Sequence, residues 1–427
     1  MTELQTFEKN QLVQFQQSAE QEYSHVAANK MSLDLSRGKP AADQLDLSNN
    51  LENCIAGNYL AEDGTDTRNY GGLRGLPEAR LLGEEIMGVP SQHIMAAGNS
   101  SLSLMHLTVL TALSQGLWQD QRHWSRSTTV KLLAPVPGYD RHFVLSDALG
   151  IELVNVNMTT NGPDMDEARK LVAADPSIKG IWCVPKYSNP TGITFSAQVV
   201  DEIAQLPNLA AADDFVVLWD NAYAVHDLEF PGEELASLWS AGLQHNTSDH
   251  LVQYASTSKI TFAGAGLSFV AASNTVLTAL ESQMSVMTIG ADKVNQLRHA
   301  RFLKGRVAKH MQAHANLLKP KFDLVLEILQ RDLGGLGIAQ WTTPKGGYFI
   351  SLDVLPGLAR EVIRLAKEVG LTLTPAGATF PNNLDPLDQN VRIAPTYASL
   401  QELKPAMEIL TLCVRLASSR YFAQQTQ

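Results

Sequence analysis

The sequence predicts an α/β fold, with a large domain built on a mostly parallel, helix-covered sheet and a smaller α+β domain. From Ile94 onward, short apolar runs alternate with helical segments, which is typical of such a sheet. A chain of 427 residues is also too long for one small core. The pattern changes near Asn316, so we place the large domain at residues 51–315 and the small domain at 1–50 and 316–427.

The elements follow from the apolar periodicity. Residues 8–29 predict a leading helix. Strands are predicted in the large domain at Val130–Ala134, Ile151–Val156, Gly180–Val184, Phe215–Trp219, Leu251–Ala255 and Leu267–Ala271. Helices are predicted there at 102–113, 164–174 and 197–205. The basic stretch 298–314 indicates one helix with a solvated face. The small domain is predicted to contain a hairpin over 341–353, a strand over 371–375 and helices over 317–329, 358–369 and 399–418.

Composition argues against several classes of function. The net charge is −11 without a dense basic cluster, so we expect no nucleic-acid partner. The three cysteines form no Cys-x-x-Cys pair, which argues against disulfides and thiolate metal sites and favours the cytoplasm. No apolar run is long enough to span a bilayer, and the N-terminus lacks an export signal. His310 and His314 lack the adjacent glutamate of a zinc motif, so we interpret them as surface histidines and predict no metal.

Lys259 is the strongest candidate for chemistry. It follows a predicted strand and lies among small residues, including Ser256 and Gly264. A crowded lysine has a lowered pKa, and its neutral amine can form a Schiff base with a carbonyl. The alternative is a solvated lysine at a strand end.

Unusual residues follow other strands, where open α/β sheets bind ligands. Tyr139, Asn189 and the pair Asp220 and Tyr223 each come after a predicted strand. A turn filler, a β-turn and a helix cap are the separate alternatives, and they are weak jointly. The run 99–101 precedes an apolar helix, which suits either a phosphate site or simple capping.

Three motifs together resemble a known family: Ser-Asn-Pro-Thr-Gly at 188–192, Asp-x-x-Tyr at 220–223 and Ser-x-Ser-Lys at 256–259. The chain resembles fold-type I, class I pyridoxal-phosphate (PLP) aminotransferases, and is most similar to the atypical aspartate aminotransferase subgroup. This resemblance implies that Lys259 holds the cofactor and shuttles a proton, and that Asp220 pairs with the pyridine nitrogen. It implies that Asn189 and Tyr223 bond the phenolic oxygen and that Tyr139 stacks on the ring.

The resemblance also assigns the phosphate and substrate contacts. It implies that the phosphate is bound by Asn99, Ser100, Ser101 and Ser256, with Tyr70 from a second subunit. Arg392 matches the arginine for the substrate α-carboxylate, and Gly38 is expected to close over the substrate. The family's usual phosphate-binding arginine is missing, since the chain reads Gly-Leu-Ser at 266–268.

The function implied is ping-pong transfer of an amino group from L-aspartate to 2-oxoglutarate by a homodimer with shared sites. A distal carboxylate needs a cation, and the candidates are Lys293, Arg298, Arg37 and Arg141. Another aminotransferase or a β-eliminating lyase on the same scaffold is an alternative. A cofactor-sensing domain of a transcription regulator is disfavoured, because only about thirty residues precede Asp34 and the chain is acidic.

Overall fold

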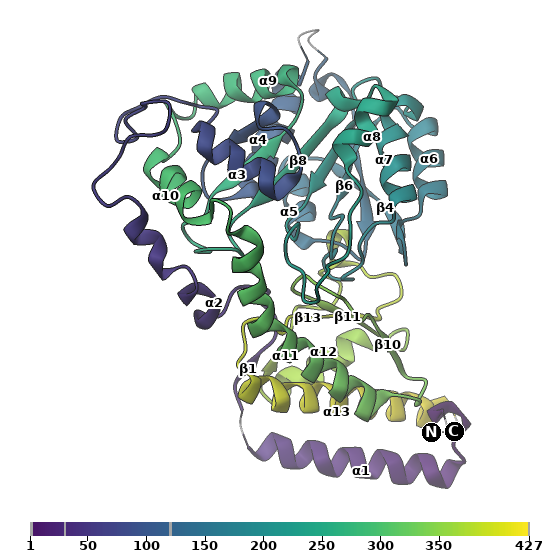
Figure 1. Cartoon of the computed structure of the whole chain (residues 1–427). Helices are drawn as coiled ribbons and strands as arrows, with labels where there is room; N and C mark the ends of the chain where they lie inside the picture. The colour runs from purple at the N-terminus through teal and green to yellow at the C-terminus, as the bar shows by residue number, and fades with distance from the viewer. Residues whose placement is uncertain (1–2, 30, 119–121, 426–427) are drawn as a thin grey trace. The chain divides into compact units, whose positions relative to one another are not determined.

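The computed structural model describes residues 3–29, 31–118 and 122–425. They form two compact units (Figure 1). The larger unit consists of Ala42–Ser188 and Ile193–Ala315, and the smaller unit of Met1–Ala41, Asn189–Gly192 and Asn316–Gln427. The predicted α/β fold class with a mostly parallel central sheet is confirmed, whereas the domain boundaries given above stay a prediction.

The larger unit contains an eight-stranded sheet in the order β2-β9-β8-β7-β6-β3-β4-β5. Its strands are β2 (Ile94–Ala96), β3 (Lys131–Val136), β4 (Glu152–Thr159), β5 (Gly162–Pro163), β6 (Ile178–Cys183), β7 (Val216–Asp220), β8 (Leu251–Ser256) and β9 (Ser268–Ala271). The five central strands, β8 to β4, are mutually parallel. Their carboxyl ends therefore meet at one edge, where Asp220 ends β7 and Ser256 ends β8.

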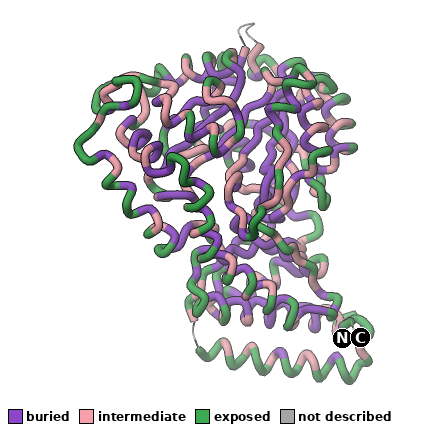
Figure 2. Tube along the Cα trace, in the orientation of Figure 1, coloured by how far each residue is buried: buried purple, intermediate pink, exposed green. Residues whose placement is uncertain are grey.

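Helices cover both faces of this sheet (Figure 1). Strands β6, β7 and β8 are buried along nearly their whole length, whereas only Val156 of β4 is buried (Figure 2, buried residues in purple). In β7, Val216 and Leu218 pack into one hydrophobic cluster, and Val217 and Trp219 pack into the cluster on the opposite face. This explains why the strand reads as a continuous apolar run. The helices are α2 (Ala42–Asp46), α3 (Pro77–Met87), α4 (Ser101–Ser114), α5 (Asp140–Ala148), α6 (Met165–Ala174), α7 (Ala197–Leu209), α8 (Leu238–His245), α9 (Asn274–Ser285) and α10 (Lys293–Leu303).

The single helix predicted over 298–314 is wrong. Helix α10 ends at Leu303, and a new helix, α11 (Val307–Leu333), contributes residues to both units. Gly305 lies between them with φ +63°, a left-handed conformation that ends a helix and favours glycine. Apolar periodicity alone does not reveal such a break.

The smaller unit has a three-stranded antiparallel sheet, β10-β11-β13, and a short parallel pair, β1 and β12. Its remaining elements are α1 (Lys9–Ala28), β1 (Leu33–Asp34), β10 (Ala339–Trp341), β11 (Ile350–Val354), α12 (Ala359–Glu368), β12 (Leu371–Thr372), β13 (Asn390–Ile393) and α13 (Leu400–Gln425).

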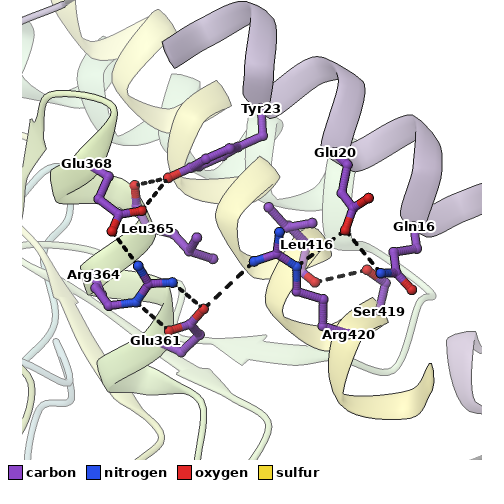
Figure 3. Close-up of polar contacts among 10 residues, drawn as sticks. All are labelled: Gln16, Glu20, Tyr23, Glu361, Arg364, Leu365, Glu368, Leu416, Ser419 and Arg420. Carbon is purple, nitrogen blue, oxygen red and sulfur yellow. Dashed lines mark hydrogen bonds and ion pairs between the residues drawn. The ribbon is translucent and has the colours of Figure 1, made fainter. Parts of the chain in front are cut away.

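Helix α1 makes polar contacts with α12 and α13 (Figure 3). The Tyr23 hydroxyl donates to the Leu365 carbonyl at 2.9 Å, and Arg420 lies 3.5 Å from Glu20. Only Leu12 and Ala19 of α1 are buried. Within the described residues, no helix combines the length and apolar character needed to cross a bilayer.

Candidate functional site

Lys259 lies in a tight turn just after β8. Backbone N–H groups of Ile260 and Thr261 both donate to the Thr257 carbonyl at 2.8 Å. The Lys259 ammonium nitrogen lies 5.0 Å from the centre of the Tyr223 ring. Burial lowers the pKa of this lysine below its ordinary value, and the Asp220 carboxylate opposes that shift only in part. The amine is therefore neutral more often near pH 7 than that of a solvated lysine.

The two carboxylate oxygens of Asp220 differ: one has a hydrogen-bond partner and the other has none among the described residues. Its carboxylate is 2% exposed, and Oδ2 lies 3.0 Å from Nε2 of His142. Oδ1 is buried without a hydrogen-bond partner among the described residues. An unsatisfied buried acceptor costs roughly 1–3 kcal/mol. The site therefore fits a ligand that brings an N–H donor to Oδ1, as a protonated pyridine ring does.

His142 was missed by the sequence analysis. It lies on α5, three residues after Tyr139, whose ring meets it edge-on at 5.0 Å. Its other neighbour is Trp182, stacked at 4.3 Å and 11°. The signal for it was its position one helical turn beyond a strand-end aromatic. Through His142, the structure brings Tyr139 and Asp220 together.

Three of the predicted phosphate residues, Asn99, Ser100 and Ser101, lie after β2, in the stretch that ends at the first residue of α4. The Asn99 amide donates to the Gly264 carbonyl at 2.9 Å, and the Ser258 hydroxyl donates to the Asn99 carbonyl at 3.1 Å. These bonds join the loop to the turn that carries Lys259. Ser100 precedes the first residue of α4 but makes no side-chain capping bond. The helix N-terminus at Ser101 thus keeps backbone donors suited to an anion.

Ser256 is a further predicted phosphate residue in this region of the larger unit. The Ser256 hydroxyl accepts from the Ser258 N–H at 3.4 Å, so it faces the same loop. Leu267, near the place of the family's arginine, is 1% exposed within the hydrophobic core and supplies no charge.

Tyr70 is not packed into its own chain, because 83% of its surface is exposed. The loop beneath it is nevertheless held firmly. Lys293 donates to the carbonyls of Asn69 and Gly71 at 2.7 and 2.6 Å. Because Lys293 is buried on these two oxygens, it is a poor candidate for a substrate carboxylate. Arg298 is half-buried, and the other two candidate cations, Arg37 and Arg141, are exposed.

Arg392 anchors the candidate site residues of the smaller unit. It lies on β13, is 8% exposed, and donates to Asn189 Oδ1 at 3.3 Å and Thr374 Oγ1 at 3.4 Å. Its guanidinium lies 4.9 Å from the Phe349 ring centre. A Cβ on Gly38 would lie 2.1 Å from Cζ of that ring, so only glycine fits. The bonds to neutral oxygens are long, and a carboxylate offers the guanidinium stronger ones.

The interpretation of His310 and His314 as surface histidines is wrong. His314 is 1% exposed and His310 is half-buried. Both rings bond the Ile260 carbonyl, at 2.7 Å from His310 and 2.9 Å from His314. Among the described residues, no group of three or more His, Cys, Asp or Glu side chains could hold a metal.

Comparison with known proteins gives consistent matches over nearly the whole chain. A family model described as aspartate amino-transferase matches residues 7–426. An aspartate aminotransferase of Corynebacterium glutamicum is 41% identical over 425 residues, covering 98% of this chain and 97% of that protein. A Mycolicibacterium smegmatis protein with a provisional aminotransferase name is 47% identical over 97% of this chain and 98% of its own length.

Solved structures agree with these matches. An aspartate transaminase from Corynebacterium glutamicum aligns with a TM-score of 0.94 and 40% identity, covering 99% of both chains. An α-aminoadipate aminotransferase from Thermus thermophilus, complexed with N-(5′-phosphopyridoxyl)-L-leucine, gives a TM-score of 0.74 over 91% of this chain and 93% of that one. At 19% identity, this second likeness shows the fold alone.

Proposed function

Since the chain belongs to the aspartate aminotransferase family, we propose that it transfers the amino group of L-aspartate to 2-oxoglutarate. The predicted family, the enzyme class and the cofactor are confirmed: the chain is an aspartate aminotransferase-like enzyme of fold type I that uses pyridoxal phosphate. The buried Asp220 carboxylate, bonded on one oxygen and unsatisfied on the other, is the observation that carries the mechanism.

The larger unit supplies groups that suit this cofactor. When bound, pyridoxal phosphate supplies a carbonyl carbon that joins to amines and a ring that accepts electrons from the substrate Cα. Asp220 Oδ1 would accept the ring N–H, and His142 keeps that carboxylate in place. The residues that would hold the phosphate are Asn99, Ser100, Ser101 and Ser256. Tyr139 would stack on the ring, and Tyr223 would donate to its phenolic oxygen. Asn189, which belongs to the smaller unit, is the other predicted donor to that oxygen.

Lys259 moves the proton. As a neutral amine, its Nζ would remove the proton from the substrate Cα and would later deliver a proton to the cofactor carbon that carries the carbonyl group. The lowered pKa of Lys259 makes that first step feasible near neutral pH. The amino group stays on the enzyme between the two half-reactions, so the oxo-acid product leaves before 2-oxoglutarate binds.

Arg392 would bind the α-carboxylate, and Gly38 would close over the substrate. The guanidinium fork makes two parallel bonds to a carboxylate, which sets the orientation of the Cα–H bond. The distal carboxylate of aspartate would be bound by Arg37, Arg141 or Arg298, the three candidates not already committed to backbone carbonyls. A cytoplasmic location fits the free cysteines Cys54, Cys183 and Cys413.

We test the substrate with amino donors of different charge. Aspartate should exceed alanine in kcat/KM with 2-oxoglutarate as acceptor. Alanine replacement of the correct arginine should lower kcat/KM for aspartate by about 10²–10³, roughly 3–4 kcal/mol, with little effect on alanine. Lys309→Ala, which removes an exposed charge on α11, is the control. Without a preference for dicarboxylic donors, the aspartate proposal fails and the aminotransferase class remains.

We also propose a homodimer in which Tyr70 completes the partner subunit's site. Its exposed ring beside a firmly held loop supports this. Tyr70→Ala and Lys259→Ala subunits, each weak alone, should regain about a quarter of wild-type activity when co-expressed, because each mixed dimer has one intact site. Failure to regain activity would mean that each site uses one chain only.

A further inference from the structure

Four histidines surround the turn that carries Lys259, and the proposed mechanism uses none of them. His226 Nε2 lies 3.3 Å from the Lys259 carbonyl oxygen. His310 and His314, one turn apart on α11, bond the Ile260 carbonyl. His299 Nε2 lies 2.9 Å from the Thr261 hydroxyl. All four belong to the larger unit, and three of them are 4% exposed or less.

The hydrogen bonds define which nitrogen carries each proton. The Gln44 amide lies 3.3 Å from Nδ1 of His314 and donates to it, which leaves the His314 proton on Nε2, facing the carbonyl. The ring of His299 has the opposite tautomer. Its Nδ1 donates to the Asn295 carbonyl at 2.8 Å, so Nε2 accepts from Thr261.

Neutral imidazoles can make all of these hydrogen bonds. A second proton on His299 would turn the Nε2 that accepts from Thr261 into a donor. The two Nε2 atoms of His310 and His314 are 3.3 Å apart, so charging both rings would be repulsive. Burial also lowers the pKa of all four imidazoles, which keeps them neutral at pH 7.

We propose that His226, His310 and His314 are positioning residues for the Lys259 amine. They donate to the carbonyls of Lys259 and Ile260, which belong to the peptide group that follows the Lys259 Cα and to the next peptide group along the chain. A lysine side chain has four rotatable bonds, so a small rotation of its peptide groups displaces Nζ by a much larger distance. A misplacement of about 1 Å can cost roughly 10²-fold in rate. This inference rests on the proposed role of Lys259.

The test compares two double variants of the holoenzyme. His310→Leu with His314→Leu removes both donors, whereas His310→Gln with His314→Gln keeps an N–H near each Nε2 position. We expect the leucine pair to lower kcat for aspartate about 10- to 100-fold with KM changed less than about threefold. The glutamine pair should stay within about threefold of the wild type.

A second readout follows the bound cofactor without turnover. The circular dichroism of its visible absorption band depends on how firmly the chromophore is held, and the pH midpoint of that band depends on the surroundings of Lys259. The leucine pair should weaken the dichroism and move the midpoint, while the glutamine pair should restore both. If the leucine pair does not fold, His310→Leu alone, at the half-buried position, should show the same changes at smaller size.

An unchanged band and kcat in the leucine variants, despite a lower melting temperature, would overturn the inference and leave the histidines as packing groups. That outcome differs from failure of the proposed function, in which the wild type itself would not transaminate.

Discussion

The free energy of unfolding at acid pH should depend on the buried imidazole of His314. Burial, reinforced by the neighbouring His310, lowers the pKa of His314 from 6.5 to about 4. The folded state therefore favours the neutral ring, while the unfolded state binds a proton already below pH 6.5. Replacement by glutamine removes the titrating group and keeps an amide that can donate to the Ile260 carbonyl.

The expected size follows from the pKa difference. A fall from 6.5 to about 4 corresponds to about 3 kcal/mol, at 1.36 kcal/mol per unit. Because the folded pKa is the lower one, this stability is fully present above pH 6.5 and is lost as the pH falls towards 4. The wild type should thus lose up to about 3 kcal/mol more than His314→Gln over that range.

Urea unfolding at fixed protein concentration, at pH 7.0, 6.0, 5.0 and 4.5, measures this difference. His25→Gln, at an exposed position on α1, is the matched control and should parallel the wild type. Carboxylates also titrate near pH 4, but they are common to all three proteins and cancel in the comparison. If His314→Gln loses as much stability as the wild type between pH 7.0 and 4.5, then His314 is not held neutral by the fold.

Two predictions concern the site itself. Asp220→Ala should lower kcat for aspartate about 10³-fold, roughly 4 kcal/mol, while visible absorbance shows that most cofactor stays bound; an unchanged rate in a single-turnover assay would refute the role of this carboxylate. Lys259→Ala should abolish transamination and leave the far-ultraviolet circular dichroism unchanged. Borohydride reduction of the wild type, followed by peptide mapping, should place the cofactor on Lys259, and a label on another lysine would contradict the assignment.

Much of the large sheet could be predicted from sequence, because strands buried on both faces are continuous apolar runs. Asp220 and Ser256 were placed at strand ends for that reason, and both lie there. The helix break at Gly305 was missed because apolar spacing continues across it.

Buried histidines were harder to predict. His142, His310 and His314 have polar side chains on helices, and helical spacing alone suggests solvent. Their burial depends on partners distant in sequence, such as Asp220 for His142 and Ile260 for the other two. The roles of individual cofactor-binding residues came from the family resemblance and remain predictions.

The contact between Gly38 and Phe349 restricts how this enzyme's donor preference can be redesigned. Position 38 looks attractive for mutagenesis, since it is the glycine expected to close over the substrate. Any side chain there must first displace Phe349, and Arg392 rests against the same ring. A library that varies residue 38 alone would therefore disturb the arginine in nearly every member. Varying residues 38 and 349 together would separate a change of pocket size from the accidental loss of the carboxylate anchor.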